Sequence, residues 1–171
     1  VKKIESEMTD RDSILRLFVD PDFDSDRAKM FGRLDQYTAF VQGRLGHLQI
    51  HPKSLVFSKR VECSGLEIPI RIIGLNSAWF SQGGKEDRQR IVLGEPPIDE
   101  LLHEPGGQGQ CLTIVLVHHP LKEAAAWYRA TEDKALNMIK TAADFVLAGH
   151  VHKSDVASQF SPLGACIEIV A

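Results

Sequence analysis

Two apolar runs in the second half of the chain end in histidine: CLTIVLVHHP at residues 111–120 and DFVLAGHVH at residues 144–152. A continuous apolar run of this length is typical of a strand that is buried on both faces of a parallel sheet. Helix-favouring residues fill positions 122–143 between the two runs, and a crossover of that length can join parallel strands. We therefore expect a βαβ unit and an α/β fold.

The histidines in these runs predict a metal site. Ligands of open α/β sheets bind beyond the carboxyl ends of the strands, which is where His118, His150 and His152 are expected. In an extended His-x-His segment, His150 and His152 would point to the same side, with Cβ atoms about 7 Å apart at a rise of about 3.3 Å per residue. Imidazoles placed in this way can each bind one ion of a metal pair. A single histidine at a strand end is more often a hydrogen-bonded surface group, and the pattern alone assigns no reaction.

The first part of the chain is predicted to be helical. Residues 10–20 favour a short helix. From residue 26 to residue 48, apolar side chains recur at a spacing of three and four, which predicts one longer helix with a broad apolar stripe. We therefore interpret residues 1–52 as a helical insertion or cap-like segment.

Residues 53–171 are predicted to form the sheet. The segments 55–63 and 66–75 are rich in β-branched and apolar residues and are separated by Ser64-Gly65, which is the pattern of a hairpin. Together with the two runs that end in histidine, they indicate a single α/β domain over residues 1–171, which the resemblance described next implies is partial.

The two histidine motifs resemble the last two motifs of the calcineurin-like metallophosphoesterases. In that family a strand ends in a ligand histidine, commonly followed by His-Pro, and a Gly-His-x-His motif follows some tens of residues later. The corresponding segments here are residues 118–120 and 149–152, and residues 73–78 resemble the strand and turn that often precede them. The resemblance covers about residues 68–171 and implies the C-terminal part of an α/β/β/α sandwich.

The resemblance also implies a site and an activity. His118 and His150 would bind one divalent metal ion and His152 a second, with manganese, iron or zinc as the candidates. Metal-bound hydroxide at this dinuclear site would hydrolyse a phosphomonoester or a phosphodiester, as in phosphatases and phosphodiesterases. No catalytic side chain is assigned. His119 is a candidate for contact with the substrate phosphate, and a structural hydrogen bond is the alternative role for it.

Three earlier motifs of the family do not occur in the sequence: Asp-x-His, Gly-Asp-x-x-Asp and Gly-Asn-His-Asp/Glu. They supply carboxylate and asparagine ligands, so activity is expected only in a complete domain, and the isolated segment is expected to be inactive. The chain starts without methionine and ends within an expected strand, so we expect the missing motifs upstream. Two alternatives stay open: a catalytically inactive interaction scaffold and a DNA nuclease of the same fold.

The composition is that of an ordinary globular domain. Of the 171 residues, 43% are hydrophobic and 25% are charged, and the formal net charge is -3. This charge does not indicate a nucleic-acid partner, although a local basic patch stays possible. No apolar run approaches the roughly 20 residues of a membrane span. We therefore expect no membrane partner. The three cysteines are odd in number and widely spaced, which predicts free thiols and a cytoplasmic location.

Overall fold

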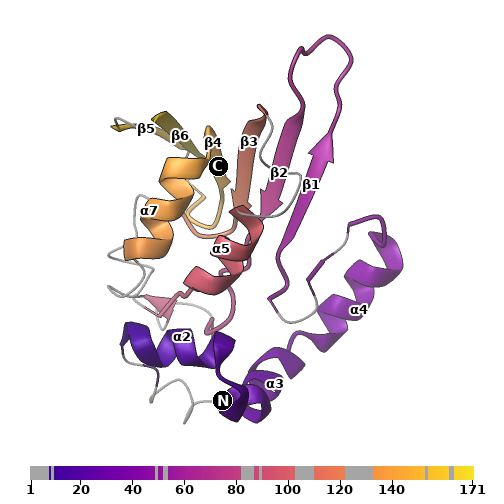
Figure 1. Cartoon of the computed structure of the whole chain (residues 1–171), viewed down its shortest axis with the longest axis vertical. Helices are drawn as coiled ribbons and strands as arrows, with labels where there is room; N and C mark the ends of the chain where they lie inside the picture. Colours follow the sequence, from indigo (N-terminus) through magenta and orange to yellow (C-terminus); the bar gives the residue numbers. More distant parts are fainter. Residues whose placement is uncertain are drawn as a thin grey trace.

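The computed structural model of this chain has a mixed α/β architecture. It describes residues 8, 10–48, 50–51, 54–81, 87–88, 90–102, 110–121, 133–152, 154–161 and 164–171. Within these ranges the chain forms a six-stranded mixed sheet and five α-helices (Figure 1). The α/β class predicted from the sequence is therefore confirmed.

Three short helices precede the sheet. They are α2 (Arg11–Val19), α3 (Asp24–Gly32) and α4 (Asp35–Arg44), with a 3-10 turn at Pro21–Phe23 between the first two. The Asp10 side chain caps α2 by accepting a hydrogen bond from the backbone N–H of Ser13, which satisfies one of the free donors at the helix start. This helix confirms the one predicted for residues 10–20. No helix in the described part of the chain is long and apolar enough to cross a membrane.

The single long helix predicted after α2 is wrong. The chain interrupts the helix between α3 and α4, where Leu34 has φ -99° and ψ 1°, outside the α-helical region. The apolar side chains consequently do not share one buried stripe. Met30 and Val41 are buried, whereas Tyr37 is 59% exposed.

The sheet has the strand order β1-β2-β3-β4-β6-β5. Its strands are β1 (Phe57–Val61), β2 (Ile70–Gly74), β3 (Leu112–Val117), β4 (Phe145–Ala148), β5 (Asp155–Ser161) and β6 (Gly164–Val170). The four central strands are parallel, and β1 and β5 pair antiparallel at the two edges. Both the predicted β1–β2 hairpin and the parallel pairing of β3 with β4 are confirmed. The sequence did not predict β5.

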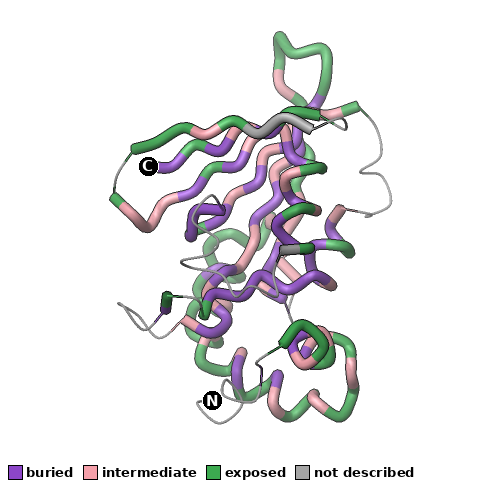
Figure 2. The backbone as a smooth tube through the Cα atoms, turned by 90° about the vertical axis from the view of Figure 1, so that its left-hand side faces the viewer, coloured by how far each residue is buried: buried purple, intermediate pink, exposed green. Residues whose placement is uncertain are grey.

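Helices α5 (Glu95–Leu102) and α7 (Asp133–Ala142) cover one face of the sheet (Figure 1). Of the crossover helix predicted for residues 122–143, positions 122–132 lie outside the described residues. Buried residues alternate with less buried ones along the strands, as the colours of the tube in Figure 2 show. The buried side chains pack together with those of the two helices in the main core. It includes Val115 and Val117 of β3 and Val146 of β4.

The opposite face of the sheet is also apolar, but it is much more exposed. Its side chains include Ile72, Ile114, Leu116, Leu147 and Ile169, which lie beside one another in the strand register. Leu147 is 38% exposed, whereas the preceding Val146 is fully buried. Parallel sheets are usually covered on both faces. The described residues form no second sheet over this face, and the α/β/β/α sandwich stays a prediction.

A second, smaller core joins α2 and α3 to the loop that follows β2. Its buried members are Met8, Ile14, Leu17, Met30, Trp79, Phe80 and Val92. The ring of Trp79 is fully buried and contacts the rings of Phe18 and Phe31 at centroid distances of 4.9 and 4.4 Å. This core therefore anchors the loop after β2 close to the carboxyl ends of the parallel strands.

Candidate metal centre

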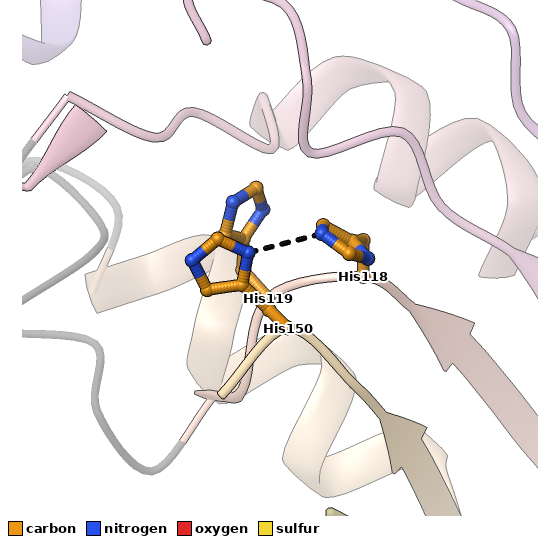
Figure 3. A group of neighbouring side chains, drawn as sticks. All are labelled: His118, His119 and His150. Carbon is orange, nitrogen blue, oxygen red and sulfur yellow. Dashed lines mark hydrogen bonds between the residues drawn. The ribbon is translucent and has the colours of Figure 1, made fainter. Parts of the chain in front are cut away.

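Histidines from two neighbouring strands meet at one edge of the sheet. His118 and His119 directly follow β3, and His150 lies two residues after the end of β4. The two strands pair in parallel, and the backbone N–H of Gly149 donates to the carbonyl oxygen of His118 over 3.1 Å. The strand ends are thus held side by side, and the three rings point toward one another (Figure 3).

The distances within this group suit one metal ion. His118 Nε2 and His150 Nδ1 are 3.0 Å apart, and one nitrogen from each of the three rings lies within 4.8 Å of the others. A tetrahedral ion with nitrogen ligands at about 2.0–2.1 Å places neighbouring nitrogens roughly 3.3 Å apart. The closest pair is already near that separation, and the third ring must approach by up to about 1.5 Å to reach it. The three imidazoles therefore fit a single ion of the kind that prefers nitrogen ligands.

His152 lies outside this group of three rings, although it was predicted as a ligand with His118 and His150. The extended His-x-His geometry behind that prediction is wrong. His150 has φ 72° and His152 has φ 50°, and the backbone N–H of Val151 donates to the carbonyl oxygen of Gly149 over 2.9 Å. This bond closes a three-residue turn centred on His150, a type that is rare and strained. The two side chains therefore do not project together as they would from a strand. The binding of a second ion by His152 stays a prediction.

Burial and repulsion between like charges favour the neutral forms of the His118 and His119 rings. Partial burial lowers the pKa of His118, and His150 and His152 lower it further because each would add a like charge. Burial, followed by the same repulsion from His150 and His118, lowers the pKa of His119 to about 4, against a smaller opposing effect of Asp87. Only a neutral imidazole offers a lone pair to a metal, so both rings are in the protonation state that binding requires.

The buried ring of His119 makes a hydrogen bond to a serine from a third strand end. Its Nδ1 lies 2.7 Å from Oγ of Ser77, which follows β2, and both residues are only 2% exposed. The structural hydrogen bond considered for His119 is therefore present. Sequence reasoning did not assign Ser77 a function. The available signal was its place in residues 73–78, which resemble the strand and turn that often precede the histidine motifs of the metallophosphoesterases.

A cavity of about 660 Å³ opens beside His118. Its walls include Tyr37 of α4, Phe57 of β1, Leu116 of β3 and Leu147 of β4, so it is mostly apolar. It lies at the carboxyl end of the exposed sheet face, where open α/β sheets bind ligands. The histidine group therefore borders a space large enough for a small molecule or for a covering segment of protein.

Comparison with known proteins gives no family assignment. No protein-family model matches the sequence, and no curated protein matches it at a significant level. The resemblance to calcineurin-like metallophosphoesterases therefore rests on the residues of the two histidine motifs.

Proposed function

We propose that this chain supplies histidine ligands to a metal centre that hydrolyses phosphate esters. The observation that carries the proposal is the 3.0 Å approach of His118 Nε2 to His150 Nδ1 beyond the carboxyl ends of parallel β3 and β4. Phosphate-ester chemistry is supported by the order of the two motifs, His-His-Pro and then Gly-His-x-His, which resembles that of the metallophosphoesterases.

The residues of the site have separable roles in this proposal. His118 and His150 hold the ion from two adjacent strands, and the backbone pairing of those strands fixes their spacing. The neutral ring of His119, 4.5 Å from that of His150 between centroids, is within reach of the same ion or of a phosphate oxygen. A divalent ion bound here would polarise the phosphate ester and supply the nucleophile.

The group contains only histidines, and the described residues add no carboxylate ligand to it. Two cations close together repel each other strongly unless negative ligands offset their charge. We therefore expect this chain alone to bind one ion and to show little turnover. In this proposal a complete domain adds the carboxylates, together with a second sheet over the exposed apolar face that contains Leu147 and Ile169.

Metal analysis and an ester assay test the proposal in two steps. The isolated chain, incubated with zinc or manganese and then dialysed, should retain one ion, measured by mass spectrometry of the metal. The protein of natural length should hydrolyse an aryl phosphate monoester or diester, and His150→Ala should abolish both turnover and metal retention.

Each alternative predicts a different outcome. Metal retention without hydrolysis of either ester in the protein of natural length would contradict the phosphoesterase and favour the inactive scaffold. Preferential cleavage of a labelled oligonucleotide would favour the nuclease. Robust turnover by the isolated chain would contradict the expected need for further carboxylates.

A further inference from the structure

The three imidazoles form a compact triangle. Ring centroids are 4.9 Å apart for His118 and His150, 4.8 Å for His118 and His119, and 4.5 Å for His119 and His150. His119 therefore lies as close to the other two rings as they lie to each other. An imidazole has two nitrogens, and the hydrogen bond made by one of them determines which tautomer the other presents.

Ser77 engages Nδ1 of His119 from a rigid position. The backbone N–H of Leu75 donates to the carbonyl oxygen of Leu116 over 2.9 Å, which extends the pairing of β2 with β3 toward the site. Oδ1 of Asn76 then accepts from the backbone N–H of Ala78 over 2.9 Å and turns the chain. The buried indole of Trp79 donates to the carbonyl oxygen of Asn76 and fixes the turn to the second core.

We propose that Ser77 is a positioning residue of the metal centre and that His119 is its third imidazole ligand. In the ligated state, Oγ of Ser77 accepts the Nδ1–H of His119. The lone pair of His119 Nε2 is then directed at the ion held by His118 and His150. The assignment rests on the metal-binding part of the proposed function and does not depend on hydrolysis of phosphate esters.

The serine hydroxyl can be removed without removing a ligand. Loss of the partner that orients a metal-bound histidine typically costs about 10–100-fold in metal affinity. Ser77→Ala should therefore weaken zinc binding by about that factor in isothermal titration calorimetry, with one ion per chain as before. Ser77→Thr keeps the hydroxyl and should recover most of the affinity. His119→Ala should lower it by at least as much as Ser77→Ala.

A matched control is available in the same chain. Oγ of Ser54 also lies 2.7 Å from Nδ1 of a histidine, His51, and Ser54 is 4% exposed, but neither residue belongs to the histidine group. Ser54→Ala should lose a similar amount of stability and keep the zinc affinity of the parent chain. Equal zinc affinity of Ser77→Ala and Ser54→Ala, with both folded by circular dichroism, would overturn the proposal.

A measurement on the unmodified chain does not depend on how any variant folds. Long-range ¹⁵N–¹H correlation spectra of the zinc-loaded chain should place the proton of His119 on Nδ1 and show a metal-induced shift of its Nε2. A proton on Nε2, or ¹⁵N shifts that zinc leaves unchanged, would overturn the assignment. If these spectra are as expected but the protein of natural length hydrolyses no phosphate ester, the proposed hydrolysis is contradicted and the ligand assignment is supported.

Discussion

Nε2 of His118 and Nδ1 of His150 lie 3.0 Å apart, although 32 residues separate them in the chain. In the absence of an ion, one of these nitrogens carries the proton that the other accepts. Metal binding requires a lone pair from both nitrogens, so the ion takes the place of the shared proton. The hydrogen bond between the rings and a metal ion are therefore mutually exclusive, and the arrangement keeps two ligand atoms together before an ion binds.

Removal of either ring should therefore damage the site severely. Loss of a partner that only orients a ligand costs about 10–100-fold in affinity, so loss of a direct ligand should cost at least about 100-fold. We expect this from His118→Ala and from His150→Ala in zinc titrations. His47→Ala is the control, because His47 is exposed in the turn after α4 and should keep full affinity. Zinc affinity of His150→Ala within a few-fold of the parent chain would contradict the site.

His152 distinguishes the site of three rings from the two-ion site predicted from the motif. Because His152 is exposed and outside the group, we expect His152→Ala to bind one zinc ion with nearly unchanged affinity. Removal of its ring should have only a small effect on the pKa of His118, for which His152 is the last of the three causes after burial and His150. Metal analysis that finds two ions in the parent chain and one in the variant would instead support the two-ion site.

Glu95 of α5 should make folding stability depend on acid pH. Its buried carboxylate pairs with Arg11 of α2, with 2.9 Å from Nη2 to Oε2, and with Lys134 of α7 at 3.1 Å. The hydrogen bond from Arg11 is the main cause that lowers the pKa of Glu95, against the opposing effect of burial. A carboxyl group with a lowered pKa stabilises the fold above its unfolded value of 4.5, and this contribution disappears as the pH falls through the folded pKa.

Glu95→Gln should consequently lower the free energy of unfolding at pH 7 by roughly 1–2 kcal/mol, since its partners are partly exposed. Between pH 7 and pH 3, urea unfolding should show a smaller loss of stability in the variant than in the parent chain. Glu62→Gln serves as the control, because the Arg60–Glu62 pair is exposed and contributes little. A parallel pH dependence in Glu95→Gln and the parent chain would refute this role.

Adjacent residues of β4 should differ in their contribution to stability. Val146→Ala should cost about 2 kcal/mol, because it removes about two buried carbon groups and leaves a small cavity in the main core. Leu147→Ala removes more carbon but should cost only about 1 kcal/mol in the isolated chain, since Leu147 is on the exposed face. In a domain with a second sheet over that face, the cost of Leu147→Ala should rise to about 2–5 kcal/mol. Urea unfolding of each variant, in the isolated chain and in a longer protein that includes the proposed second sheet, measures these costs.

Local patterns were sufficient to predict the strands around the site. The continuous apolar runs, the length between them and the Ser64-Gly65 turn correctly indicated β3, β4 and the β1–β2 hairpin. The break at Leu34 was missed because the apolar spacing continues across it, although Gly32 at the end of α3 is a residue that favours a helix end. Strand β5, Asp155–Ser161, escaped notice because an edge strand of mixed polarity lacks the apolar run that marks a buried one.

The sequence alone was enough to bring His118 and His150 together, because strand direction and the crossover length follow from local pattern. Only the tertiary structure shows which other residues belong to the histidine group. Spacing by two suggested that His150 acts with His152, but the turn centred on His150 ends the strand geometry that this pairing requires. Ser77 reaches His119 because β2 lies beside β3 in the sheet, a neighbourhood that no spacing along the chain encodes.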